Sequence, residues 1–272
     1  IAAAPPAGGE EQPPPKTGSV LDGLDPEQRA AAEISEGPVL IVAGPGTGKT
    51  RTVTHRLAHL VLERGVAAEQ CLAITFTRRA ADEMTERLHT LLGEPAADVT
   101  VATFHSFGLQ LLREHHHLLD LPADFGVADV SQQHEILTRL TGDERRARQA
   151  RQRLSQPGPD DDLPSRYTAA LRAEGLVDFD ELVRLPVALL ESDNTVREHY
   201  RRVFRWITVD EYQDVDDTQY RLLRLLAPQD ANLTAIGDPD QAIYSFRGAD
   251  VGFFLRFEQD YPRAPVVHLT RN

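Results

Sequence analysis

The stretch from Leu40 to Thr50, with the sequence L-I-V-A-G-P-G-T-G-K-T, constrains the fold more than any other part of the chain. It begins as an apolar run typical of a buried strand, breaks into glycines, and is followed by apolar residues at helical spacing. Glycines carry no Cβ, so successive backbone N–H groups can point at an anion, and the following helix adds the positive end of its dipole. The stretch therefore predicts a phosphate-binding loop between a strand and a helix.

Each part of this loop has a chemical role that its residue type can fill. Lys49 supplies a compact positive charge to the terminal phosphates, and the Thr50 hydroxyl is a ligand for Mg²⁺. The pattern G-x-x-x-x-G-K-[ST] has glycine where this chain has Ala43, which is small enough to end the strand. A chance glycine-rich turn is the alternative, and the flanking strand and helix patterns argue against it. We predict that a nucleoside triphosphate with Mg²⁺ contacts Gly44, Gly46, Thr47, Gly48, Lys49, Thr50 and Arg51.

The composition limits the class of protein. A chain of 272 residues can form one large α/β domain or two smaller ones. Its net charge of −13 argues against a generally basic nucleic-acid binder, so any nucleic-acid contact must be a local channel. The single cysteine, Cys71, excludes a disulfide framework and fits a reducing compartment. Because the sequence has no apolar run of about 18 residues and no secretory signal pattern, we expect a cytoplasmic protein.

Composition and pattern also suggest a division of the chain. Residues 1–20 are mostly Ala, Pro and Gly with a few charges, and they cannot bury enough apolar surface to fold. We predict that they form a disordered linker or tail, which leaves room for an upstream fused domain. Strand patterns fade between residues 108 and 196, so we predict a helical insertion there. The remaining segments, 21–107 and 197–272, are predicted to form one α/β domain.

An acidic pair, Asp210 and Glu211, follows the strand-like run 206–209. In a protein with a phosphate-binding loop, Asp210 can hold Mg²⁺ through water, and Glu211 can act as the base that orients the attacking water. The alternative, an acidic cap on the next helix, is disfavoured by adjacent carboxylates at the end of a strand. We predict that this pair completes the chemistry of the loop.

A second polar segment follows the strand-like run 233–237. Here Gln241 can contact the terminal phosphate of a nucleotide, while Tyr244, Phe246 and Arg247 reach elsewhere. This interleaving predicts a segment that couples a nucleotide to a polymer. A turn with a buried aromatic residue stays open as the alternative.

A third segment, Phe76, Thr77 and Arg78, follows the run 72–75. An aromatic residue with neighbouring threonine and arginine at the end of a strand can stack on a base and hold a phosphate. A core phenylalanine beside solvated arginines is the alternative.

Two further clusters carry weaker signals. Consecutive helical residues point about 100° apart, so His115, His116 and His117 cannot converge on one metal ion, and a solvated face is the better interpretation. Between residues 145 and 153, five arginines form the one basic cluster, in which contact with a duplex backbone and a solvated helix are equally open.

Together these segments resemble superfamily 1 DNA helicases of the UvrD/Rep/PcrA type. The resemblance runs from about residue 21 to the end of the chain, in the order L-D-P-E-Q-R-A-A, A-G-P-G-T-G-K-T, I-T-F-T-R-R-A-A-D-E-M, T-F-H-S-F, V-D-F-D-E-L, V-D-E-Y-Q-D and I-G-D-P-D-Q-A-I-Y-S-F-R-G-A. It implies an α/β P-loop NTPase (RecA-like) fold, with a parallel sheet flanked by helices and an inserted α-helical subdomain. It also implies ATP and Mg²⁺ as cofactors, and 3′–5′ translocation on single-stranded DNA with duplex unwinding at single/double-strand junctions, in DNA repair, recombination or replication.

The resemblance assigns roles to matching positions. Gln28 is similar to the glutamine that contacts adenine, Asp210 and Glu211 to the metal-holding and catalytic carboxylates, and Gln241 to a sensor of the terminal phosphate. On the same basis Lys49, Glu211 and Gln241 are the catalytic residues, and Thr50 and Asp210 are the metal ligands. The expected DNA-binding residues are Phe76, Thr77, Arg78, Thr103, His105, Tyr244, Phe246 and Arg247.

Three departures qualify these expectations. The chain has Arg78 and Arg79 where relatives usually have Asn-Lys, and Phe246 where Trp is common. It also reaches only Asn272 within a segment similar to L-x-x-N-Y-R, so an arginine finger and a second RecA-like domain are expected from further sequence, and these 272 residues alone are expected to be nearly inactive. A nucleotide-dependent DNA-binding switch without unwinding, attached to another catalytic domain, is the main alternative. A small-molecule P-loop kinase is a remote third.

Overall fold

The computed structural model describes residues 18–155, 161–241 and 250–271. Its centre is a six-stranded sheet in the order β3-β2-β6-β7-β1-β8, in which every neighbouring pair is parallel. The strands are β1 (Val39–Ala43), β2 (Cys71–Thr75), β3 (Thr100–Thr103), β6 (Trp206–Val209), β7 (Asn232–Gly237) and β8 (Val266–Leu269). The expected α/β fold with a parallel sheet flanked by helices is confirmed.

Alternate residues of the strands face two separate cores, as the period-2 geometry of a strand requires. In β1, Val39, Ile41 and Ala43 pack with α1 (Pro26–Glu33), α2 (Lys49–Leu62) and α3 (Arg78–Leu92) on one face of the sheet. Leu40 packs into the core of the other face. The helices of that face are α4 (Phe104–Glu114), α8 (Glu181–Ser192), α9 (Asn194–Val203), α10 (Asp217–Leu226), α11 (Val251–Leu255) and α12 (Phe257–Asp260).

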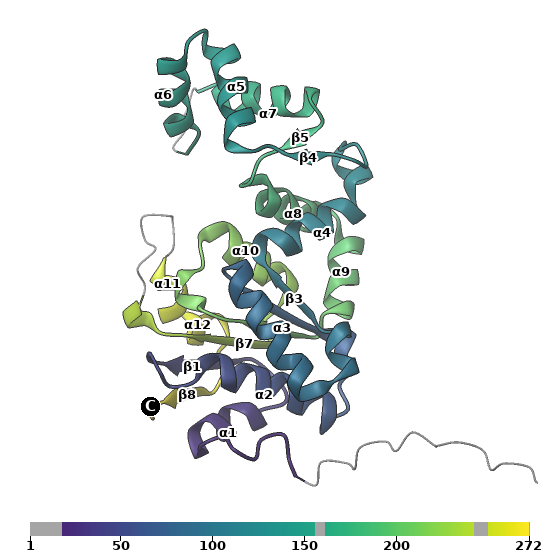
Figure 1. Cartoon of the computed structure of the whole chain (residues 1–272), viewed down its shortest axis with the longest axis vertical. Coiled ribbons are helices and arrows are strands. Elements are labelled where there is room, and N and C mark those ends of the chain that lie inside the picture. The colour runs from purple at the N-terminus through teal and green to yellow at the C-terminus, as the bar shows by residue number, and fades with distance from the viewer. Residues whose placement is uncertain (1–17, 156–160, 242–249, 272) are drawn as a thin grey trace, which may run out of the picture.

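Three helices lie away from the sheet, at the top of Figure 1. They are α5 (Val130–Thr141), α6 (Glu144–Ser155) and α7 (Leu163–Ala173), and they share a small core of their own. Next to them lies the short parallel pair β4 (Gly126–Val127) and β5 (Leu176–Val177), of which Leu176 contributes to this core. Leu111 and residues 183–196, within the predicted insertion 108–196, pack instead into the core of the sheet. The division of the chain into domains stays a prediction, with residues 128–176 as the part that has a separate core.

Single-turn 3₁₀ helices connect several of these elements. They span Ala68–Gln70, Glu94–Asp98, His116–Leu119, Tyr212–Asp214 and Pro239–Gln241. The third of them explains why the expectation for the three histidines was wrong in part. Helix α4 ends at Glu114, and His115 is its C-cap residue, whose backbone N–H donates to the carbonyl oxygen of Leu111. The His115 side chain is only 14% exposed, and its Nε2 lies 3.2 Å from the Tyr200 hydroxyl.

Two features are absent from the described ranges of the chain. None of the helices there is long and apolar enough to span a membrane. Nor do the residues of these ranges include a group of three or more His, Cys, Asp or Glu side chains that could hold a metal ion.

Gly108 sets how closely α4 approaches α8. A Cβ built on Gly108 would collide with the carbonyl oxygen of Leu182, a backbone atom that cannot rotate away. We expect Gly108→Ala to lower the free energy of unfolding by about 1–3 kcal/mol, because overpacking forces the two helices apart. Urea unfolding monitored by circular dichroism measures this change. The exposed Gln110→Ala on the same helix serves as the control and should change stability by less than about 0.5 kcal/mol. Equal unfolding midpoints for the two variants would show that the helices are free to adjust.

Candidate functional site

The parallel register brings the predicted site residues to one edge of the sheet. In the ladder, Val42 of β1 lies opposite Gly237 of β7, and Ala235 of β7 lies opposite Val209 of β6. Because all three strands run the same way, the segments that follow them emerge side by side. The glycine-rich loop therefore lies beside the turn after β7, and the acidic pair after β6 lies next to both.

The loop has the backbone conformation that its glycines predict. Gly46 and Gly48 have φ values of 79° and 82°, in the left-handed region that favours glycine. A Cβ at Gly48 would lie 2.6 Å from the side-chain nitrogen of Gln28, and that nitrogen donates a hydrogen bond of 2.9 Å to the carbonyl oxygen of Thr47. No described side chain caps the first turn of α2. The loop is thus a tight cradle below a helix N-terminus whose N–H groups are available to an anion.

Lys49 and Glu211 meet across this cradle although they are 162 residues apart in the chain. The Lys49 ammonium donates to Glu211 Oε2 at 2.9 Å, and the two side chains are 12% and 38% exposed. Glu211 has a φ of 51°, an uncommon conformation for a residue other than glycine and one that is frequent at functional sites. A phosphate group bound by the loop would compete with Glu211 for the charge of Lys49.

Asp210 is a buried carboxylate, 5% exposed, at the end of β6. Burial and, second, the neighbouring charge of Glu211 raise its pKa to about 6. Such a group gains from a bound cation. Mg²⁺ at nucleotide sites commonly uses one or two carboxylates plus phosphate oxygens and water, so Asp210 with the Thr50 hydroxyl on α2 is a donor set that fits it.

A glutamine that received no role from the sequence connects the acidic pair to the turn after β7. Gln213 donates from Nε2 to Glu211 Oε2 at 2.9 Å, and its Oε1 accepts the backbone N–H of Asp238 at 3.0 Å. The Asp238 carboxylate in turn accepts a hydrogen bond of 2.5 Å from the side chain of Gln241. Gln213 lies in the motif D-E-Y-Q-D, and Asp238 lies in the motif G-D-P-D-Q. Their presence in these motifs is the sequence signal that could have identified them as site residues.

The residues expected to contact nucleic acid differ in burial and in the hydrogen bonds of their side chains. Phe76 is half-buried and packs edge-on against Phe104, with ring centroids 5.5 Å apart. The hydroxyl of Thr103 is used within the fold, because it caps α4 by accepting the backbone N–H of Ser106. Thr77 caps α3 in the same way, through the N–H of Ala80, and Arg78 beside it is exposed. Tyr244, Phe246 and Arg247 lie outside the described residues.

His105 stacks on a residue that the sequence did not single out. Its ring lies 3.8 Å from that of Phe179, centroid to centroid, at an interplanar angle of 17°. Phe179 is 52% exposed, unusual for a large apolar side chain, and it belongs to the motif V-D-F-D-E-L. Burial lowers the pKa of His105, which favours the neutral ring.

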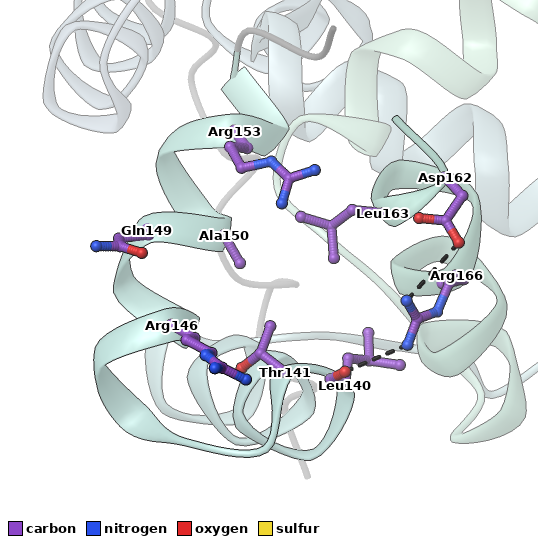
Figure 2. Close-up of a pocket in the computed structure, with 9 residues that line it drawn as sticks. All are labelled: Leu140, Thr141, Arg146, Gln149, Ala150, Arg153, Asp162, Leu163 and Arg166. Carbon is purple, nitrogen blue, oxygen red and sulfur yellow. Dashed lines mark hydrogen bonds and ion pairs between the residues drawn. The ribbon is translucent and has the colours of Figure 1, made fainter. Parts of the chain in front are cut away.

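The basic cluster lies on α6, away from the sheet. Arg146 and Arg153 of α6 and Arg166 of α7 line a cavity of about 330 Å³, which Figure 2 shows between α5, α6 and α7. Each of the three has a carboxylate within reach, at 3.4, 2.6 and 3.7 Å respectively. These partners offset much of the positive charge of the cluster.

Asp214 gives the site a measurable pH dependence. It is 9% exposed, one of its carboxylate oxygens has no hydrogen-bond partner among the described residues, and burial raises its pKa to about 6, with the charge of Glu211 adding to the effect. A raised pKa in the folded state means that stability falls as the pH rises from about 4 to about 6 and stays lower above that. We expect Asp214→Asn to stabilise the fold by about 1–2 kcal/mol at pH 7 and to have no such effect near pH 4.

Thermal unfolding of both proteins across this pH range measures the difference. The exposed Asp98→Asn is the control for the change in net charge. A stabilisation that is the same at pH 4 and pH 7 would mean that the ionisation of Asp214 is not the cause of the effect.

Comparison with known proteins is consistent with this geometry. A family model described as UvrD/REP helicase N-terminal domain matches residues 24–158 and 159–262. Similar relatives include three proteins named ATP-dependent DNA helicase PcrA. The one from Leuconostoc citreum is 37% identical over 280 residues, which cover 93% of this chain and 37% of the relative. The one from Bacillus subtilis (strain 168) is 36% identical over 94% of this chain and 38% of the relative, and the one from Staphylococcus aureus (strain Mu50 / ATCC 700699) is 35% identical over 93% and 38%.

The chain therefore spans about 38% of the length of the curated relatives it matches. The family model covers most of its residues, from 24 to 262. The chain belongs to the UvrD/REP helicase N-terminal domain family.

Proposed function

We propose that the chain is the ATP-binding N-terminal part of a DNA helicase, which couples ATP hydrolysis to 3′–5′ translocation on single-stranded DNA and to duplex unwinding. The observation that carries this proposal is the 2.9 Å contact between Lys49 and Glu211, which joins the phosphate-binding loop to a carboxylate suited to act as a base. The names of the relatives, ATP-dependent DNA helicase, support the same activity.

We propose a role for each residue that its position supports. Lys49 and the N–H groups of the loop bind the phosphates, and Gln28, already held against the loop, faces the adenine. Thr50 and Asp210 hold Mg²⁺, which neutralises charge on the phosphates. Once a phosphate draws Lys49 away, the Glu211 carboxylate is free to accept a proton from the attacking water. Gln241 follows the state of the terminal phosphate from the turn after β7.

The partners extend beyond this chain. We propose that a second RecA-like domain of the same protein closes the ATP site, and that single-stranded DNA and single/double-strand junctions are bound along the edge marked by Phe76 and His105. The lone Cys71 is buried, which supports a reducing compartment, and we place the protein in the cytoplasm. A DNA-binding switch without unwinding, attached to another catalytic domain, is the alternative, and a strand-displacement assay on the full-length protein separates the two.

The role of Glu211 can be tested in the full-length protein. We expect Glu211→Gln to keep ATP binding and to lower DNA-stimulated turnover by at least about 10²-fold, because the amide cannot accept the proton. Steady-state ATPase rates and binding of a fluorescent ATP analogue measure the two properties. Glu258→Gln, on α12, is a matched control that removes the same charge from an exposed position outside the proposed site. Turnover that survives Glu211→Gln would exclude Glu211 as the base.

The need for a second lobe can be tested with the chain itself. An arginine finger contributes roughly 10³–10⁵-fold to the rate of phosphoryl transfer. We therefore expect these 272 residues alone to bind ATP with Mg²⁺ weakly and to hydrolyse it at least about 10³-fold more slowly than the full-length protein with DNA. Comparable turnover numbers for the two proteins would contradict the proposal that the ATP site is shared between domains.

A further inference from the structure

The side chain of Gln213 is almost completely buried, and both ends of its amide form hydrogen bonds. It is 2% exposed, within the 3₁₀ turn Tyr212–Asp214 that follows the acidic pair. Nε2 donates to Glu211 Oε2 at 2.9 Å and lies 3.5 Å from Asp214 Oδ2, while Oε1 accepts the N–H of Asp238 at 3.0 Å. A buried amide with both ends engaged is a bridge between two segments that the sequence separates.

The direction of this bridge is fixed by its partners. A backbone N–H can only donate, so the end of Gln213 that faces Asp238 must be the carbonyl oxygen. The carboxylate of Glu211 can only accept when ionised, so the end that faces it must be the NH₂ group. A flipped amide would place two donors together at one end and two acceptors together at the other.

The strand opposite is shaped to admit this side chain. A Cβ on Gly237, the last residue of β7, would collide with Gln213 Oε1, and it would also lie 3.1 Å from the backbone nitrogen of Tyr212 and from the ring of Phe254. Gly237 is not one of the described glycines that have a positive φ. Its backbone conformation therefore does not require glycine. The Gln213 amide, the backbone of Tyr212 and the ring of Phe254 together leave no room for a side chain there.

Gln213 and Lys49 donate to the same oxygen of Glu211. In the proposed function, a phosphate group draws Lys49 away from Glu211. Gln213 is then the donor that still holds this carboxylate in place. Because the other end of its amide is bound to Asp238, whose carboxylate holds Gln241, the orientation of Glu211 depends on the position of the turn after β7.

We propose that Gln213 is a positioning residue for the ATPase reaction, which aims Glu211 and makes that aim depend on the Asp238–Gln241 turn. This inference rests on the proposed function, in which Glu211 is the base and Gln241 contacts the terminal phosphate. Gln213 itself touches neither nucleotide nor water in this scheme and acts through Glu211.

The test uses the full-length protein with saturating single-stranded DNA. Gln213→Glu keeps the shape and the acceptor for Asp238 but places a second carboxylate against Glu211. We expect kcat to fall by about 10–100-fold while the KM for ATP changes by less than about threefold, because an aimed base acts on the chemical step. Gln213→Met removes both hydrogen bonds at similar volume and should also lower kcat selectively. Gln219→Glu, at another buried glutamine in the cap of α10, is the matched control and should leave both constants near those of the wild type.

A double-mutant cycle tests the link to the turn. If Gln213 connects Glu211 to Gln241, the double variant Gln213→Met with Gln241→Ala should have a kcat no more than about twofold below that of the slower single variant. If the falls in kcat of the two single variants multiply in the double variant, the link between Gln213 and Gln241 is overturned. A rise in KM without a fall in kcat would overturn the positioning role. Thermal unfolding and binding of a fluorescent ATP analogue confirm that each variant is folded; if Gln213→Met does not fold, the cycle is run with Gln213→Glu. A wild-type protein without DNA-stimulated ATPase would contradict the proposed function instead.

Discussion

The parallel pairing of β1, β7 and β6 is the constraint on which the rest of the site depends. Parallel neighbours end at the same edge of a sheet, so three segments that are distant in the sequence emerge within a few ångströms of each other. A shift of the register by one residue would turn Leu40, Leu233 and Ile207 from the core that they share to the opposite face of the sheet. The contact between Lys49 and Glu211 is a consequence of this register rather than a cause of it.

The charge at this edge of the sheet favours a bound cation. Lys49 faces Glu211 directly, while Asp210 and Asp214 lie nearby with pKa values that burial raises to about 6. The chain as a whole carries a net charge of −13, which repels a triphosphate at long range. In the proposed function, attraction for a triphosphate therefore comes from local groups: the N–H groups of the loop, Lys49 and a divalent cation. Burial strengthens each of these interactions, since a low dielectric weakens the screening of charge.

The sequence predicted those features that depend on local geometry. Strand positions followed from apolar runs, such as the one that precedes the glycine-rich loop and forms β1. It could not predict contacts that only the packed fold creates. Gln213 stood in a recognised motif, but its role depends on Asp238 being 25 residues away in sequence and adjacent in space. His115 was expected in a helix and instead ends one, because the chain turns there.

Helix α1 connects the glycine-rich loop to the end of the last described strand, β8. At its C-terminal end, Arg56, 1% exposed, donates to the carbonyl oxygens of Ala31 and Ala32, and burial lowers its pKa to about 10, still well above neutrality. These bonds satisfy carbonyls that a helix end leaves without partners, and they fix α1 to α2. At its other end, Gln28 holds the loop and Glu27 accepts two hydrogen bonds from Thr270, just after β8. Because Glu27 and Gln28 are neighbours on a helix that is held at both ends, a displacement of the chain after β8 would also displace Gln28 and the loop that it holds.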